Sequence, residues 1–419
     1  MNAEAPQRGS HFLGAHKRFG TGGGLLARIL APGFHRILDR IDAGVDHGMF
    51  EGKLPDGSIR IIGGRGEGPV AEITIHSWNA LLRLVNSGSV GWYRAWELGE
   101  WESPDLVPLF DLFTRNRAGL KDTGRASGIF RWIAKLRHSR RHNDKVRARQ
   151  NIQYHYDLGN DFYALWLDKN MSYSSAIFED SAGKAETLEE AQTKKVTAMA
   201  LRLDSKPGQK VLEIGCGWGY LSGTLAREYG LDVTGISLSD EQTQWAREHH
   251  PDASFLIQDY RDVADQYDAV ASVEMVEAVG QKYWPDFLDC IARNLKPGGR
   301  AAIQYISIAD DIFEQYAASA DFIQTYIFPG GMLLSESRFR ALAEERGLSW
   351  ADQHDFGADY AETLRLWRER FDAVVEDGKL PAGFDERFVR LWRYYLAYCE
   401  GGFRGGGINV SQITLIKEK

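Results

Sequence analysis

The stretch "KVLEIGCGWGYLSGTLAREYG", residues 210–230, decides the fold expected for most of this chain. Its first part is the apolar run of a buried strand, and its last part has the spacing of a helix. Gly215, Gly217 and Gly219 stand at alternate positions between the two. Glycines at such a turn let the backbone pass close to a ligand, because they carry no Cβ atom. The stretch therefore predicts a strand, a ligand-binding loop and a helix.

More strands and helices alternate after this unit. We expect strands in "LDVTGISLS", "SFLIQD", "YDAVASV" and "KPGGRAAIQYI", and helices in "DEQTQWAREHH" and "WPDFLDCIARNL". Alternating strands and helices are typical of a parallel sheet with helices on both faces. The sequence therefore predicts a doubly wound α/β domain over residues 150–419.

The composition is that of an ordinary globular protein, with 43% hydrophobic and 26% charged residues. A length of 419 residues predicts two or more domains. The net charge of −8 gives no overall indication of nucleic-acid binding. Three scattered cysteines, Cys216, Cys290 and Cys399, indicate neither a disulfide framework nor a zinc site and fit a reducing cytoplasm. We find no signal peptide and no apolar run of the ~20 residues that a membrane span needs.

The first 149 residues differ in character from the rest. Residues 1–24 look loose, and residues 25–114 predict a small α+β domain whose first helix is interrupted at Pro32. Segment 115–149 carries twelve Lys and Arg residues against two Asp, and Ile129, Phe130, Ile133 and Leu136 recur there at helical spacing. A basic amphipathic helix suits an anionic membrane surface. A solvated linker helix packed on a domain is the alternative, and RNA binding is a weaker third option.

The glycine loop predicts a particular cofactor. Its spacing is G-x-G-x-G, and the following strand "GISLS" lacks the acidic residue that would hold an NAD ribose, so both features argue against a dehydrogenase. Glu213, just before the glycines, suits a cationic ligand with an amine, such as S-adenosylmethionine (SAM). In "QDYRD", Gln258 and Asp259 could hydrogen-bond the edge of an adenine while Tyr260 stacks on its face.

Several longer motifs resemble those of the cyclopropane-fatty-acyl-phospholipid synthases. They are "YHYDLGNDFYALWLD", "MSYSSAIF", "TLEEAQTKK", "VLEIGCGWG", "GISLSDEQ", "QDYRD", "YIFPGGML", "FGADYAETLRLWRERF" and "YYLAYCEGGFR". They run in order from about Tyr154 to near the C-terminus, and the N-terminal part resembles the small lipid-side domain of the full-length members. The resemblance implies a class I SAM-methyltransferase fold. It also implies methyl transfer from SAM to a cis double bond in a phospholipid acyl chain, by a cytoplasmic enzyme bound peripherally to the inner face of the membrane.

The resemblance also implies residue roles. The positions expected to bind SAM are Tyr173, Ser174, Gly215, Gly217, Ser237, Leu238, Gln242, Gln258, Asp259 and Tyr260, beside Glu213 and Gly219. Cyclopropane-forming members hold a bicarbonate ion near the sulfonium methyl, and Glu277, Ile306 and Tyr360 match three of its ligands. Three neighbouring positions depart from the family pattern, because Ser175 replaces a cysteine and Ala278 and Gln304 replace histidines. Glu274 replaces a residue that is usually small, so we do not expect bicarbonate to bind in the usual way.

These departures lead to a hypothesis about the base. Methyl transfer leaves a carbocation on the acyl chain, and the base that then takes a proton chooses between a cyclopropane and a methyl-branched alkene. We expect Glu274 to supply a carboxylate in place of bicarbonate, with Glu277 nearby. Repulsion and burial of two close carboxylates would keep one ionised and the other protonated. The alternative is that Glu274 points to solvent or caps the following helix.

The expected function is therefore C-methylation of unsaturated phospholipid acyl chains, giving a methyl-branched, furan-precursor or cyclopropane product. We expect aromatic side chains to shield the cation, namely Tyr360 and one or two from a lid in "DFIQTYIFPGG", residues 321–331. Ordinary cyclopropane synthesis is the nearer alternative, and small-molecule N-methylation is further away. A non-catalytic lipid-binding module is the alternative of another class. A homodimer is compatible with the sequence, but no stretch demonstrates it.

Overall fold

The chain forms two units, each built on its own sheet, in a computed structural model that describes residues 8–9, 12, 25–120, 158–179 and 186–419. Unit 1 comprises Met1–Arg140, Glu314–Pro329 and Ala382–Gly407. Unit 2 comprises Arg141–Phe313, Gly330–Pro381 and Ile408–Lys419. The basic helix expected around residues 129–136 and nearly all of segment 1–24 lie outside the described residues. The domain boundaries expected from the sequence stay predictions.

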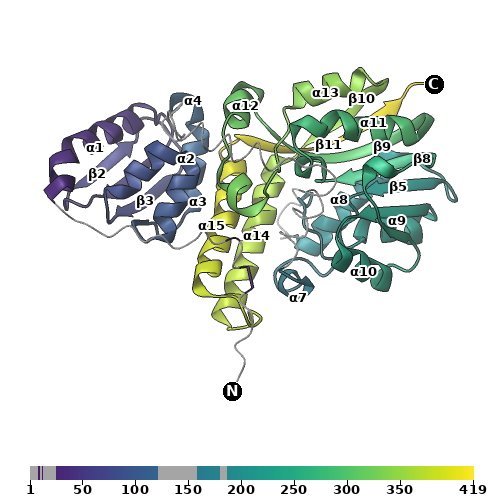
Figure 1. The fold of residues 1–419 in the computed structure, drawn as a ribbon, viewed down its shortest axis with the longest axis horizontal. Helices are drawn as coiled ribbons and strands as arrows, with labels where there is room; N and C mark the ends of the chain where they lie inside the picture. Colours follow the sequence, from purple (N-terminus) through teal and green to yellow (C-terminus); the bar gives the residue numbers. More distant parts are fainter. Residues whose placement is uncertain (1–7, 10–11, 13–24, 121–157, 180–185) are drawn as a thin grey trace. The chain divides into compact units, whose positions relative to one another are not determined.

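Unit 2 is built on a seven-stranded sheet in the order β10-β11-β9-β8-β5-β6-β7 (Figure 1). In chain order its strands are β5 (Lys210–Ile214), β6 (Asp232–Ser237), β7 (Ser254–Ile257), β8 (Tyr267–Val273), β9 (Leu295–Ile308), β10 (Leu348–Asp355) and β11 (Ile408–Lys417). Its helices are α7 (Asn160–Tyr163), α8 (Leu188–Leu203), α9 (Tyr220–Tyr229), α10 (Asp240–His249), α11 (Trp284–Asn294), α13 (Glu336–Glu344) and α14 (Gly357–Glu376). This is the predicted α/β fold, and each strand and helix expected between residues 210 and 308 is present.

One expectation about the sheet was wrong in part. The neighbours β9, β8, β5, β6 and β7 are parallel, as predicted, but β11 runs antiparallel to both β9 and β10. The sheet is therefore mixed. The direction of β11 depends on the end of the sheet at which the preceding chain enters, and the strand's own sequence carries no information about that.

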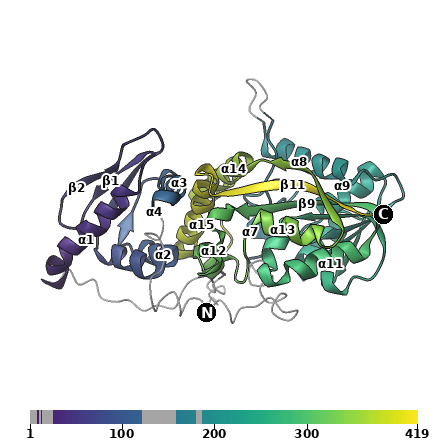
Figure 2. The ribbon, with the colours of Figure 1, turned by 90° about the horizontal axis from the view of Figure 1, so that it is seen from above.

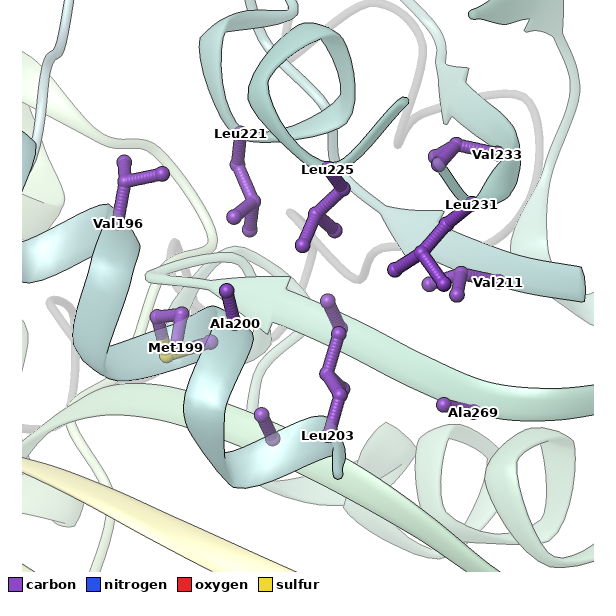
Figure 3. Packing of buried hydrophobic residues seen from close by; sticks show 12 residues of the cluster. Val196, Met199, Ala200, Leu203, Val211, Leu221, Leu225, Leu231, Val233 and Ala269 are labelled. Carbon is purple, nitrogen blue, oxygen red and sulfur yellow. The ribbon is translucent and has the colours of Figure 1, made fainter. Parts of the chain in front are cut away.

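Helices cover both faces of this sheet (Figure 2). On one face, α8 and α9 pack on β5, β6 and β8 through a cluster that includes Met199, Leu203, Leu225, Val211 and Val233 (Figure 3). On the other face, aromatic rings of α11 and α13 meet, with the centroids of Phe287 and Phe339 6.4 Å apart. Both faces are thus apolar, which fits the continuous hydrophobic runs of the central strands.

A capping box fixes the start of α8. The Thr187 hydroxyl accepts a hydrogen bond from the Glu190 backbone at 3.2 Å, and the Glu190 carboxylate accepts one from the Thr187 backbone at 2.9 Å. These two bonds satisfy backbone donors that the first turn of a helix leaves unpaired. The "TLEEAQTKK" motif is therefore a helix start, and the helix carries its Lys195 against the sheet.

Unit 1 contains a four-stranded sheet in the order β2-β1-β3-β4. Its strands are β1 (Met49–Lys53), β2 (Ile59–Gly63), β3 (Val70–Ile75) and β4 (Trp101–Glu102). Its helices are α1 (Leu25–Ala43), α2 (Asn79–Glu97), α3 (Val107–Arg115), α4 (Arg117–Leu120), α15 (Glu386–Arg404) and the π-helix η5 (Ile323–Ile327), while α12 (Asp310–Ala317) spans the boundary between the units. The expected interruption at Pro32 was wrong, because α1 is continuous there. An interior proline removes one backbone hydrogen bond and crowds the carbonyl four residues earlier, but its fixed φ is helical, so the other hydrogen bonds of a 19-residue helix can continue past it.

Aromatic side chains form the core of unit 1 where segment 314–329 meets α2 and α15. The ring of Tyr93 lies 4.8 Å from that of Phe322, 4.6 Å from that of Tyr326 and 5.0 Å from that of Tyr394. Phe322 and Tyr394 are fully buried. The predicted lid segment is thus held by ring contacts within unit 1, and its role as an acyl-chain lid stays a prediction. Within the described residues, no helix combines the length and apolar character needed to cross a bilayer.

Candidate active site

The loop after β5 has the backbone conformation that its glycines predict. The φ angles of Gly215, Gly217 and Gly219 are 81°, 51° and 88°, a region that L-residues rarely adopt. A Cβ atom on Gly215 would meet the Met275 side chain at 2.5 Å, whereas one on Gly217 would meet nothing within 4 Å. Gly217 therefore borders open space at the carboxyl end of the sheet, where α/β folds bind their ligands.

Buried polar groups around this loop fit a ligand with hydrogen-bonding groups. Glu213 is buried at the end of β5, where it accepts a hydrogen bond from the Ser222 hydroxyl, and burial raises its pKa to about 7. The Gln242 amide nitrogen on α10 is buried and has no hydrogen-bond partner among the described residues. Ser237 ends β6 beside it, with Leu238 next in the chain. An unpaired buried donor is costly unless a ligand or water pairs with it, so these residues fit SAM.

The predicted adenine-side residues lie after β7. The backbone of Gln258 donates to Ser237 O at 3.1 Å, which ties this turn to the end of β6. The Asp259 carboxylate accepts from Arg261 Nε at 2.8 Å and Nη2 at 2.6 Å. The Tyr260 ring is buried with its centroid 5.9 Å from that of Phe287. The expected adenine contacts of these three residues stay predictions.

Ser174 lies beside the buried side chain of Lys195, which was not among the predicted site residues. The Lys195 ammonium on α8 donates to Ser174 Oγ at 2.7 Å. Burial lowers the pKa of Lys195, while the charges of Glu274 and Asp168 oppose that shift. Tyr173 packs in an aromatic group with its ring 5.4 Å from that of Trp367. A lysine on the apolar face of "EAQTKK" was the signal that could have identified Lys195.

Glu274 directly follows β8, and its carboxylate is held by three donors. Its φ of 49° turns the chain at the strand end. Its Oε1 accepts from the Ser175 backbone at 2.9 Å and from Gln304 Nε2 at 2.8 Å, and its Oε2 accepts from the Tyr360 hydroxyl at 2.7 Å. Burial raises the pKa of Glu274, and the three donors oppose that shift. The carboxylate therefore neither points to solvent nor caps the next helix, so the structure contradicts that alternative.

Glu277 has a different environment in the short helix η3 (Val276–Ala278). Its Oε1 accepts a hydrogen bond from the Ile306 backbone, and its Oε2 is buried without a partner among the described residues. Burial, and to a smaller extent the charge of Glu274, raise the pKa of Glu277 to about 8. Near neutral pH the geometry thus favours an ionised Glu274 beside a protonated Glu277.

The structure brings together the six residues predicted for the reacting centre, with two differences in detail. Ser175 contacts Glu274 through its backbone N–H, because its hydroxyl donates to Ala176 O at 2.9 Å. The Ile306 backbone serves Glu277, where the resemblance implied bicarbonate. Gln412 on β11, which was not among the predicted residues, donates to Gln304 Oε1 at 3.0 Å. A glutamine inside the apolar strand "NVSQITL" was the available signal.

Comparisons with known proteins bear on the family and the fold. A family model described as mycolic acid cyclopropane synthetase matches residues 143–413. The tuberculostearic acid methyltransferase UfaA1 of Mycobacterium tuberculosis is 38% identical over 360 residues, which cover 82% of this chain and 83% of the relative. The cyclopropane-fatty-acyl-phospholipid synthase of Escherichia coli K12 is 36% identical over 349 residues, covering 82% and 87%.

Solved structures of cyclopropane synthases are similar to this chain in fold. The cyclopropane synthase MmaA2 from M. tuberculosis superimposes with a TM-score of 0.59 at 28% identity, covering 64% of this chain and 98% of that structure. The mycolic acid cyclopropane synthase CmaA1, solved as a complex with SAH and CTAB, gives a TM-score of 0.59 at 28% identity with the same coverage.

Proposed function

This chain belongs to the mycolic acid cyclopropane synthetase family and is a SAM-dependent methyltransferase, and from that premise we propose that it methylates the double bond of unsaturated phospholipid acyl chains. We further propose that Glu274 is the base that completes the reaction and that the product is a methyl-branched chain without a ring. The observation that carries the proposal is that the Glu274 carboxylate accepts three hydrogen bonds, from Ser175, Gln304 and Tyr360. These residues stand at positions where the resemblance implies ligands of bicarbonate.

SAM, when bound, would supply an electrophilic methyl group to the alkene, and the bond between that methyl carbon and sulfur would break to release S-adenosylhomocysteine. The electron pair of the double bond forms the new carbon–carbon bond, and a cation remains on the neighbouring chain carbon. Glu274 then takes one proton through a carboxylate oxygen. If that proton comes from a chain carbon, the C–H electron pair forms a new double bond. If it comes from the added methyl group, the same pair closes a cyclopropane ring. The position of the base relative to the chain therefore decides the product.

The pair of glutamates is suited to this task. Glu274 meets three donors, which favour its ionised form, whereas Glu277 meets one backbone donor and has a pKa raised to about 8. The pKa of Glu274 is raised above its ordinary value, so its ionised carboxylate is a stronger base than one in water. Tyr360 carries both a donor to Glu274 and an aromatic ring for the developing cation. Its ring is itself held by Trp367, at a centroid distance of 6.1 Å.

Bicarbonate does not fit this arrangement. Three donors that could hold the ion, from Ser175, Gln304 and Tyr360, already bind the Glu274 carboxylate. Gln304 also lacks the positive charge that a histidine could offer to an anion. The reaction should therefore proceed without added bicarbonate.

Two relatives bear on the product. One is described as a tuberculostearic acid methyltransferase and the other as a cyclopropane-fatty-acyl-phospholipid synthase, at 38% and 36% identity. The two sequence identities are too similar to favour either the methyl-branched or the cyclopropane product. The preference for a ring-free product thus rests on the base at Glu274, and cyclopropane synthesis by the same base is the second candidate.

The test uses a host without a cyclopropane synthase of its own. Expression should add methyl-branched unsaturated acyl chains to its phospholipids, and hydrogenation before mass spectrometry distinguishes them from cyclopropanes of equal mass. Glu274→Gln should lower turnover at least ~100-fold, since general-base removal typically has effects of this size. Glu344→Gln, at an exposed glutamate on α13, is the control. Full activity of Glu274→Gln with an unchanged product would overturn the proposal.

A rescue experiment sharpens this test. The positive φ of Glu274 suits glycine, so Glu274→Gly should fold and leave room among the three donors. Bicarbonate or formate should then restore part of the lost turnover, while neither should stimulate the unsubstituted enzyme. Stimulation of the unsubstituted enzyme by bicarbonate would show that Glu274 does not replace the ion.

A further inference from the structure

A chain of hydrogen bonds crosses the interior of unit 2 from Arg202 on α8 to the Glu274 carboxylate. Arg202 Nε donates to Gln412 Oε1 at 3.1 Å, Gln412 Nε2 donates to Gln304 Oε1 at 3.0 Å, and Gln304 Nε2 donates to Glu274 Oε1 at 2.8 Å. Gln304 and Gln412 are fully buried and face each other as register partners on β9 and β11. Two fully buried amides that face each other across neighbouring strands call for an explanation.

The residues at the two ends of this hydrogen-bond chain fix the orientation of both amides. An arginine side chain has donors only, so Gln412 must turn its carbonyl oxygen toward Arg202 and its amide nitrogen toward Gln304. An ionised carboxylate accepts only, so Gln304 must turn its nitrogen toward Glu274. Reversing either amide would set donor against donor or acceptor against acceptor.

The second hydrogen of each amide agrees with this direction. Gln304 Nε2 also donates to Ser175 O at 3.3 Å, and Gln412 Nε2 also donates to Lys195 O at 3.4 Å. Each amide thus has two acceptors at its nitrogen and one donor at its oxygen. The orientation of Gln304 on Glu274 is therefore specified by contacts from α8, β11 and the loop that carries Ser175.

We propose that Arg202 and Gln412 are positioning residues that act through Gln304, holding its amide nitrogen on Glu274 so that this carboxylate is ionised and correctly directed when it takes the proton. This inference rests on the proposed role of Glu274 as the base. The positive charge of Arg202 polarises the two amides in the same sense, and aligned hydrogen bonds strengthen one another in a buried site. The hydrogen-bond chain thereby gives Glu274 part of the positive charge that a histidine at position 304 would provide.

Other groups also face the Glu274 carboxylate. They are Glu277 in η3, the Lys195 ammonium on α8 and the Tyr360 hydroxyl on α14. At the far end, Arg202 also donates to Asp352 O. None of these side chains is replaced in a Gln412 variant, but Gln412 Nε2 also donates to Lys195 O. A changed pH profile is therefore assigned to the hydrogen-bond chain only where the Arg202 variants, which leave that bond in place, shift the profile as well.

The decisive variant is Gln412→Glu, which keeps the length of the side chain and reverses one end. The new carboxylate can still accept from Arg202, but in its ionised form it cannot donate to Gln304 Oε1. It competes with Glu274 for the Gln304 nitrogen instead. With SAM and vesicles of unsaturated phospholipid, kcat should fall at least ~10-fold while the KM for SAM is unchanged. The acid limb of the pH–rate profile should move up by about one pH unit, because Glu274 loses a donor.

Matched variants separate this effect from simple destabilisation. Thr414→Val, on the same face of β11, removes a buried hydroxyl that has no partner in the described part of the chain, so it should leave the pH profile unchanged. Arg202→Met should shift the profile in the same direction as Gln412→Glu, and Arg202→Lys should recover part of the shift. If Gln412→Glu fails to fold, Gln412→Leu and the two Arg202 variants carry the same test.

A double variant tests the route. If Gln412 acts through Gln304, then Gln412→Glu should cause no further loss of kcat in a Gln304→Leu background. Additive losses, or an unchanged profile in Gln412→Glu, would overturn the inference. Glu274→Gln separates this result from the fate of the proposed function. If Glu274→Gln is inactive but Gln412→Glu has a normal pH profile, only the positioning role of Arg202 and Gln412 is overturned. If Glu274→Gln is fully active, the proposed role of Glu274 as the base is overturned.

Discussion

Glu274 and Glu277 stand three residues apart, yet the protein treats them differently. Glu274 receives donors from the loop at Ser175, from β9 and from α14, whereas Glu277 receives one backbone donor and leaves a buried oxygen unpaired among the described residues. In both cases burial is the largest cause of the raised pKa, and the number of donors decides which carboxylate keeps its charge. Identical side chains thus meet surroundings that favour different protonation states.

The raised pKa of Glu277 predicts a pH dependence of stability. Its pKa rises from the ordinary glutamate value of 4.5 to about 8 in the folded protein, so folding favours the protonated form. Its contribution to stability is therefore complete below about pH 4.5 and is lost as the pH rises through about 8. Each pKa unit corresponds to about 1.4 kcal/mol, so the predicted change over this range is several kcal/mol.

Urea unfolding at pH 5, 6, 7 and 8 checks this prediction. The free energy of unfolding should fall more steeply toward pH 8 in the unsubstituted protein than in Glu277→Gln, which has no proton to lose. Glu213 and Asp321 also have raised pKa values, of about 7 and about 6, so the difference between the two proteins is the relevant quantity. Parallel pH profiles for the two proteins would contradict the raised pKa of Glu277.

At the scale of elements, the loop between β5 and α9 depends on backbone conformation. The positive φ of Gly217 disfavours any other residue, and the open space beside it is where a Cβ would meet a ligand. Gly208, in the turn before β5, offers a matched comparison. It also has a positive φ, of 78°, and a Cβ there would likewise meet nothing within 4 Å.

Alanine at these two glycines should therefore separate conformation from binding. Gly208→Ala and Gly217→Ala should each lower the free energy of unfolding by about 1 kcal/mol, because both force L-alanine into the left-handed region. Only Gly217→Ala should raise the Kd for SAM, by at least ~10-fold, since only its methyl group would enter the proposed cofactor space. Urea unfolding measures the first quantity and calorimetric titration the second, and equal SAM affinities would place the cofactor elsewhere.

At the scale of the whole molecule, the last strand of the chain lies inside a sheet. β11 pairs with β9 on one side and β10 on the other, and it carries Gln412. The sheet of unit 2 is therefore incomplete until Ile408–Lys417 has been made. Segments 314–329 and 382–407 belong to unit 1, so the polypeptide leaves unit 2 twice and returns to it after each of these segments.

Truncation tests this dependence. Removal of Ile408–Lys419 should abolish SAM binding and cooperative unfolding of unit 2, because β9 and β10 would lose their shared neighbour. Removal of the exposed Glu418 and Lys419 alone should preserve both. Retained SAM binding by the longer truncation would show that β11 is dispensable for the site.

The sequence by itself determined the α/β fold, the glycine loop and the family, because these depend on local patterns. A strand, three alternate glycines and a helix follow one another within 21 residues, so spacing along the chain is sufficient to predict them. The same local reasoning indicated that Glu274 follows the end of a strand. It could not predict which donors this carboxylate meets, since Ser175 and Tyr360 are 99 and 86 residues away.

Tertiary structure decided the rest. Only the packing of β9, α14 and the loop at Ser175 around the end of β8 brings three donors to Glu274, and only the antiparallel insertion of β11 sets Gln412 opposite Gln304. The partners of Gln412 lie 108 and 210 residues away in the sequence, so no spacing rule reveals them. The protonation states of the two glutamates and the orientation of the donors depend on these long-range contacts and on burial. The contacts and the burial arise only once the sheet of unit 2 has formed.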